Sequence, residues 1–359
     1  MKKFILINIF ILMASLSYSD QEIDNLNNLL KNANVNVIDK NTITQPKIDA
    51  KTNQTENTNI KNTEFFKQPD KKYTNDTLIG LNNLFEKSSD FAVISEYIDL
   101  NIKKVDKNIA DEMIMMYEKY YYSIPLSTEI FIEDEQLIDK KFSSLILEEA
   151  KKYNNDYTEL IKNYNSIENV ELKDFLKSLY TRNLSLTYSN RYFYFTVNYD
   201  RLQTYSEYLT SDMLSYLKYS DNEIRHPAAA NSQIIIPISE LIDRILIAEN
   251  AISKSNNKEL NKEFSKMLVF HFENLLLGVA DTPVFNYDTK HISNDFLTSY
   301  KSYISKNGVF KSDMEKFLND LSKENYNKIP QTYGEKIKFF NKITSYYNLS
   351  KDETFKSSL

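Results

Sequence analysis

Residues 235–280 read IIPISELIDRILIAENAISKSNNKELNKEFSKMLVFHFENLLLGVA. Apolar residues recur here at intervals of three and four on both sides of a short polar stretch, Lys254 to Asn257. This spacing places them on one face of an α-helix. The stretch therefore predicts two amphipathic helices, over residues 235–252 and 260–280, that pack as an antiparallel hairpin. Pro237 is compatible with this prediction because a helix accepts proline in its first turn.

The same spacing recurs in successive segments throughout residues 76–349. The last three helices are predicted near residues 293–306, 311–324 and 334–348. No repeat of fixed length with constant signature positions is present in the sequence, so a regular repeat array is not predicted. The predicted fold class is all-α, an irregular multi-helix bundle or a short α-solenoid of antiparallel helical hairpins.

The aromatic run RYFYFTVNY at residues 191–199 has an ambiguous pattern. Its Tyr, Phe, Thr and Val residues favour a β-strand by their intrinsic preference. In a wider window, however, apolar residues fall on one helical face for about seven turns. These residues are Tyr192, Phe195, Tyr199, Leu202, Leu209, Met213 and Tyr216. The wider window predicts a helix over residues 190–219.

The beginning of the chain is typical of a secretory signal peptide. Residues 1–3 (MKK) carry positive charge, residues 4–16 are almost entirely apolar, and Ser17 and Ser19 are small residues suited to a cleavage site. The apolar run is shorter than the roughly 20 residues of a membrane-spanning helix. The sequence therefore predicts a signal peptide over residues 1–19, with no transmembrane segment after its removal and a location in the periplasm or outside the cell.

The rest of the chain divides into four predicted parts. Residues 20–33 have the spacing of a short amphipathic helix. Residues 34–75 are dense in Asn, Thr, Lys and Asp, so they bury too little apolar surface to fold and predict a disordered polar linker. Residues 76–349 form the helical domain, and residues 350–359 form a flexible tail.

Composition argues against several function classes. The net charge is −6, and Lys and Arg form no long basic cluster, so a nucleic-acid partner is not predicted. The chain has no Cys, which excludes disulfides, thiol catalysis and thiolate metal sites. Its four glycines form no phosphate-binding loop, and its three histidines have no metal-site spacing. We therefore predict neither a cofactor nor a metal.

Two ionisable residues fall in the middle of apolar helical stripes. Glu249 shares a face with isoleucines of the first helix in the quoted stretch, and His271 shares a face with Phe264 and Leu268 of the second. A buried charge costs several kcal/mol unless it is paired, so each residue needs a partner. In a hairpin the two lie roughly 13 Å apart along the helix axes, so they do not serve each other. Either both are satisfied core groups or they mark a polar pocket.

The arginines are confined to one part of the chain. The sequence has 39 Lys but only five Arg: Arg182, Arg191, Arg201, Arg225 and Arg244. A guanidinium provides planar, two-pronged hydrogen bonding that an ammonium lacks. Arg244 has Glu240 one turn earlier as a simple partner, and Arg191 is predicted to reach Glu249 or a ligand carboxylate. The alternative is that the arginines pair with acids at the edge of the core.

Residues 221–228 (DNEIRHPA) form the candidate functional loop. Arg225 would bind an anion there and His226 would carry a proton. Residues 281–291 would lie nearby if successive hairpins stack. The candidate catalytic residues are thus His226, Glu249 and His271, and the candidate ligand-binding residues are Arg191, Arg225 and His226. The alternative is an ordinary loop between helices.

Three function hypotheses remain open from the sequence. The leading one is a non-enzymatic exported protein that binds a protein, peptide or small ligand of the cell envelope through a face or groove. The second is an envelope enzyme, a hydrolase with a site around Arg225 and His226. The third is a structural envelope protein that forms homo-oligomers through its aromatic-rich helices.

Overall fold

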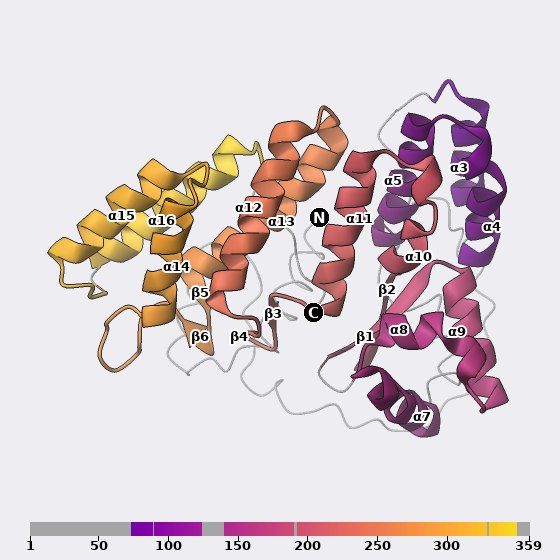
Figure 1. Ribbon diagram of the computed structural model, residues 1–359, viewed down its shortest axis with the longest axis horizontal. Helices are drawn as coiled ribbons and strands as arrows, with labels where there is room; N and C mark the ends of the chain where they lie inside the picture. The colour runs from indigo at the N-terminus through magenta and orange to yellow at the C-terminus, as the bar shows by residue number, and fades with distance from the viewer. Residues whose placement is uncertain (1–72, 89, 124–139, 190–191, 329, 350–359) are drawn as a thin grey trace, which may run out of the picture. The chain divides into compact units, whose positions relative to one another are not determined.

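The computed structural model describes residues 73–88, 90–123, 140–189, 192–328 and 330–349 (Figure 1). All of them belong to one compact unit. The described residues contain thirteen α-helices, several single 3-10 turns and three two-stranded antiparallel hairpins. The fold is all-α, as the spacing of apolar residues predicts. The predicted segments at residues 20–33, 34–75 and 350–359 lie wholly or almost wholly outside the described residues.

The first helices show how local sequence sets their limits. Helices α3 (Asp76–Lys87), α4 (Phe91–Asn101) and α5 (Lys107–Ser123) come first in the described chain. The side chain of Asn75 accepts a hydrogen bond from the Thr77 N–H, which caps the otherwise unsatisfied start of α3. Helix α5 is buried on most of its sides. It therefore carries polar side chains into the core as well as apolar ones.

Helices α7 (Lys140–Ala150), α8 (Tyr157–Lys162) and α9 (Val170–Thr181) follow. A left-handed turn at Asn154 and Asn155, where φ is 55° and 63°, separates α7 from α8. Asparagine tolerates this conformation better than other non-glycine residues. The turn brings Asp156 to the N-cap of α8.

The predicted helix over residues 190–219 is wrong. The chain instead forms a hairpin of β1 (Leu184–Ser189) and β2 (Tyr192–Val197), followed by α10 (Tyr199–Gln203) and α11 (Ser211–Arg225). The partner of β2 lies before the aromatic run, so the run alone does not reveal it. Side chains alternate along each strand, and Leu184 pairs with Val197 as two fully buried residues. The strand preference of the aromatic run decided its structure, and the helical spacing holds only within α10 and α11.

The hairpin predicted from residues 235–280 is confirmed. It consists of α12 (Ile238–Lys254) and α13 (Lys258–Leu277), which pack against each other. Helix α12 begins three residues later than predicted and α13 ends three residues earlier, because small strands flank the pair. These strands are β3 (Ala229–Ala230) with β4 (Gln233–Ile234), and β5 (Gly278–Val279) with β6 (Thr282–Pro283).

The two small hairpins are hydrogen-bonded to each other. The Asp281 N–H donates to the Ser232 carbonyl over 2.9 Å, and the Ile234 N–H donates to the Thr282 hydroxyl over 3.1 Å. The open end of the α12–α13 pair is therefore fastened by one backbone–backbone and one backbone–side-chain hydrogen bond. Residues 281–291 accordingly begin beside the hairpin that follows the candidate loop.

Helices α14 (Asn294–Ser305), α15 (Lys311–Lys323) and α16 (Pro330–Tyr346) end the described chain, close to the predicted ranges. Helix α14 packs on α12, and α16 packs on α13. The core is rich in Phe and Tyr, with Tyr117, Phe264 and Tyr300 among its largest fully buried side chains. None of the helices among the described residues has the length and apolar character needed to span a membrane.

Candidate functional site

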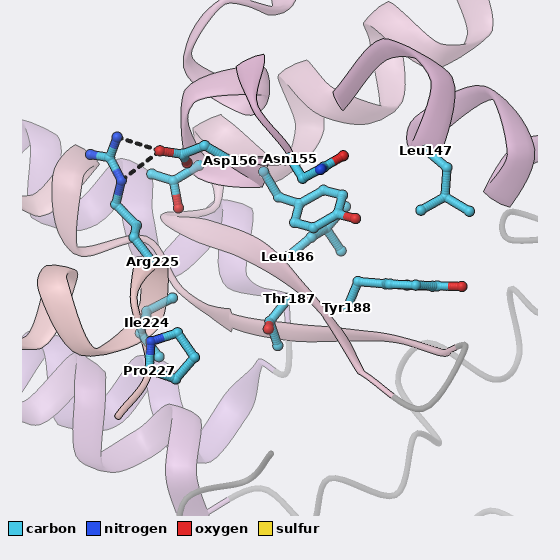
Figure 2. Close-up of a pocket in the computed structure, with 11 residues that line it drawn as sticks. Leu147, Asn155, Asp156, Leu186, Thr187, Tyr188, Ile224, Arg225 and Pro227 are labelled. Carbon is cyan, nitrogen blue, oxygen red and sulfur yellow. Dashed lines mark hydrogen bonds and ion pairs between the residues drawn. The ribbon is translucent and has the colours of Figure 1, made fainter. Parts of the chain in front are cut away.

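A pocket of about 420 Å³ lies beside strand β1 (Figure 2). Its walls come from α7, the start of α8, β1 and the C-terminal end of α11. The lining residues are Leu147, Asn155, Asp156, Tyr157, Thr158, Leu186, Thr187, Tyr188, Ile224, Arg225 and Pro227. The volume lies in the range of small-molecule sites. Of the sequence-predicted site residues that the structure describes, only Arg225 lines this pocket.

An ion pair forms one end of the pocket wall (Figure 2). The Arg225 Nε donates to Asp156 Oδ2 over 2.8 Å, and Arg225 Nη2 donates to the same oxygen. The other Asp156 oxygen accepts the Glu159 N–H over 3.0 Å at the start of α8. Asp156 therefore fixes both the helix and the guanidinium, and the pair is a rigid polar wall.

Two further carboxylates surround the same guanidinium. Arg225 Nη1 lies 3.5 Å from Asp221 Oδ2, and Arg225 Nη2 lies 3.9 Å from Glu159 Oε2. Contacts to three carboxylates leave the guanidinium poorly placed to receive an anionic ligand. The anion-binding role predicted for Arg225 therefore has no support in this geometry.

The opposite wall is aromatic. The ring of Tyr157 lies 5.5 Å from the ring of Phe193 and 6.4 Å from that of Tyr188. Tyr188 is 37% exposed, whereas the Leu186 side chain beneath is buried. The hydroxyls of Thr158 and Ser185 lie 2.9 Å apart and join α8 to β1. The wall thus combines an accessible ring with a packed apolar floor.

His226 follows Arg225 but does not line the pocket. Its imidazole is exposed and makes no hydrogen bond or ion pair with the residues that the structure describes. Its backbone N–H donates to the Asn222 carbonyl over 2.8 Å and ends α11. Arg191 lies outside the described residues.

Glu249 is a buried carboxyl with its own partners. The Tyr303 hydroxyl donates to Glu249 Oε1 over 2.6 Å, and the Val309 N–H donates to Glu249 Oε2 over 3.1 Å. Burial raises the pKa of Glu249, and the two hydrogen bonds oppose that rise. Glu249 is thus a satisfied core group outside the pocket.

His271 belongs to a separate buried ionic group. Its Nε2 lies 3.2 Å from Glu223 Oε1, although the ring is not aligned for a hydrogen bond. Arg244 Nη1 donates to the same Glu223 oxygen over 2.5 Å, and Arg244 also pairs with Glu240, as predicted. Burial alone would raise the pKa of Glu223, but His271 and Arg244 outweigh it and lower the pKa. This group connects α11, α12 and α13.

Sequence reasoning missed a third polar group in the core, around Glu118 of α5. The Tyr199 and Tyr216 hydroxyls both donate to Glu118 Oε1, the latter over 2.5 Å. Burial, supported by repulsion from Glu263, raises the pKa of Glu118 to about 7, against the opposing effect of the tyrosine hydrogen bonds. The sequence gives only a weak indication of this polar group, because α5 has no clear polar face against which a buried Glu118 would stand out.

The remaining arginines pair with acids at the surface. Arg201 Nη2 lies 2.9 Å from Asp99, and Arg182 Nε lies 3.6 Å from Asp90. Within the described ranges, no group of three or more His, Asp or Glu side chains is arranged to hold a metal ion.

The sequence did not indicate most of the pocket residues, mainly because they come together only in the folded chain. Asp156 and Tyr157 look like an ordinary helix start, and Tyr188 looks like part of a polar segment. Only the β1–β2 hairpin brings Tyr188 to Tyr157. No protein family model, curated protein or solved structure matches this chain.

Proposed function

We propose that the protein is an exported, non-enzymatic helical binding protein whose ligand site is the pocket beside β1. The ligand is a small organic molecule or a peptide side chain of the cell envelope. The observation that carries this proposal is a pocket that combines the accessible Tyr188 ring, the buried Leu186 side chain and the fixed Arg225–Asp156 pair. A concave site that joins apolar and aromatic surface to oriented polar groups is typical of ligand sites.

The placement of the titratable residues favours binding over hydrolysis. Glu249 and His271 have partners in the core and do not line the pocket. A general acid or base needs to lie within hydrogen-bonding reach of its substrate. The predicted signal peptide supports a location outside the cytoplasm.

Tyr188 and Tyr194 provide a matched test of the pocket. Both are on the β1–β2 hairpin with almost equal exposure, 37% and 38%, but only Tyr188 lines the pocket. We expect fragments from an aromatic and aliphatic library to bind the wild type and the Tyr194→Ala variant equally in saturation-transfer NMR. The same fragments should bind Tyr188→Ala about fivefold more weakly, because a contact between aromatic rings contributes about 1 kcal/mol.

Two outcomes would contradict the proposal. Absence of any fragment binding at millimolar concentration would remove the basis for a ligand site. Equal weakening by both substitutions, with unchanged circular dichroism, would place the binding elsewhere on the hairpin.

A further inference from the structure

We infer that the ligand of this pocket is an organic cation, with an ammonium or guanidinium group on an apolar or aromatic body. This inference rests on the proposed binding function and specifies the chemistry of the ligand. It follows from the charges around the Arg225–Asp156 pair, from the aromatic wall, and from the contacts that Arg225 already makes with carboxylates.

The charges around the Arg225–Asp156 pair do not balance. Two cations, Arg225 and Lys162, pair with four carboxylates; of these six residues only Arg225 and Asp156 line the pocket, and the other four lie outside its lining. The carboxylates are Asp156, Glu159, Asp200 and Asp221, with Asp200 Oδ2 3.1 Å from the Lys162 Nζ. This group of residues therefore carries two more negative charges than positive ones. A ligand cation would complement that excess, whereas an anion would add to it.

The surroundings of Asp221, next to Arg225, also favour an added cation. Burial raises the pKa of Asp221, Arg225 opposes that rise, and Asp200 and Asp156 add smaller repulsions. Arg225 therefore does not fully offset the cost of ionising Asp221. A further positive charge nearby would lower the pKa of Asp221, because opposite charges within a few ångströms stabilise the ionised carboxyl.

The aromatic wall favours the same sign of charge. Tyr157 and Tyr188 both line the pocket, and the face of a tyrosine ring attracts a cation by about 0.5–1 kcal/mol at an exposed site. The positive charge of Arg225 does not offset this preference for a cation, because the guanidinium is already paired with carboxylates. An anion would have to displace Asp156 from Arg225, and Asp156 also caps α8.

Probes with one aromatic body and different charges test the inference. We would titrate the mature full-length protein with phenethylamine, 2-phenylethanol and 3-phenylpropionate at low salt, and follow binding by NMR. We expect phenethylamine to bind about fivefold more tightly than 3-phenylpropionate, and the difference to shrink as salt is added. The blocked peptides acetyl-Gly-Lys-Phe-Gly-amide and acetyl-Gly-Glu-Phe-Gly-amide extend the comparison to peptide side chains and distinguish a free amine from a basic peptide.

Two substitutions with the same change in net charge separate a local effect from a global one. Asp221→Asn removes a carboxylate beside Arg225, whereas Asp243→Asn removes one that pairs with Lys306 at the surface. The preference for the cation should fall about twofold or more in Asp221→Asn and stay unchanged in Asp243→Asn. The affinity for 2-phenylethanol should be equal in both variants.

The outcomes distinguish this inference from the proposed function. Equal binding of the three phenyl probes would overturn the inference and leave the pocket as a ligand site. A preference for 3-phenylpropionate would overturn it and assign Arg225 to an anion. If none of the probes bound, the proposed function would fail with it.

Discussion

The carboxyl of Glu118 connects three helices of the core, because it belongs to α5 and accepts hydrogen bonds from tyrosines of α10 and α11. Both tyrosine hydroxyls donate to one of its oxygens. A carboxyl that is 5% exposed and has a pKa of about 7 retains its proton at a pH where the unfolded chain has lost it. The stability of the protein therefore depends on pH through this residue.

The direction of that dependence follows from the raised pKa. The pKa of Glu118 rises from 4.5 in the unfolded chain to about 7 in the folded one, so the native state binds more protons between these values. The free energy of unfolding then falls as pH rises from about 4.5 to 7, by up to about 3 kcal/mol from this residue. Glu118→Gln should abolish the part of this decrease in the free energy of unfolding that comes from Glu118.

Urea unfolding at pH 4.5 and pH 8 provides the measurement. We expect the wild type to lose more stability between the two values than Glu118→Gln, by roughly 1–3 kcal/mol. Glu96→Gln, at an exposed position of α4, is the control and should follow the wild type. Identical profiles for all three proteins would show that Glu118 ionises normally.

The sequence indicated some of these residues and not their partners. The spacing of isoleucines placed Glu249 on a buried face, and the spacing around Phe264 did the same for His271, because helical geometry relates residues within one element. Their partners Tyr303 and Glu223 lie on other helices. Local spacing contains no information on which helices meet.

At the scale of elements, two glycines show where backbone conformation limits the helices. Gly278 ends α13 with φ of 72°, and a Cβ there would lie 2.8 Å from the Thr282 carbonyl oxygen. Gly334 lies within α16, and a Cβ there would meet nothing within 4 Å. Substitution of glycine by alanine should therefore change the stability of the protein in opposite directions at these two sites.

Gly278→Ala should destabilise the protein by roughly 1–3 kcal/mol, since the left-handed conformation and the close contact both penalise a side chain. Gly334→Ala should stabilise it by about 0.5–1 kcal/mol, because alanine restricts the unfolded chain and favours the helix. Chemical denaturation of the two variants measures both effects. A stabilising Gly278→Ala would mean that the β5–β6 turn relaxes to accept the methyl group.

Helices were predicted more reliably than strands because the residues that interact within a helix are close together in the sequence. A helix is held by bonds between residues a turn apart, so its pattern is contained in its own sequence. The β1–β2 hairpin depends on Leu184 and Leu186 finding Val197 and Phe195 across a turn. In that case tertiary burial and strand preference overrode a helical spacing that extended into the following helices.

At the scale of the whole molecule, the proposed export makes a prediction about the mature chain. Expression of the full sequence in a bacterium with a general secretion pathway should yield an exported protein that begins at Asp20. Intact mass spectrometry of the periplasmic or secreted fraction measures this start. Leu12→Arg should block export by interrupting the apolar run, and Asn8→Leu should preserve it. An unprocessed chain in the cytoplasm would contradict the proposal.

The all-α class of the molecule was predictable because it sums many local patterns. The candidate pocket was not, apart from Arg225, because it joins α7, α8, β1 and α11 from separate stretches of the chain. The stretch that contains the arginines, residues 182–244, supplies six of the eleven lining residues of this candidate pocket. Each arginine among the described residues pairs with an acidic side chain.

The hydrogen bonds between Ser232 and Asp281 and between Ile234 and Thr282 turn the α12–α13 pair into a closed loop of chain. Helices usually fray from their free ends, but this pair has a tight turn at one end and a clasp of two hydrogen bonds at the other. Its helices therefore lack the easiest route to partial opening, since separating them requires the clasp to break first. Slow, concerted hydrogen exchange across both helices is the expected dynamic signature of this arrangement.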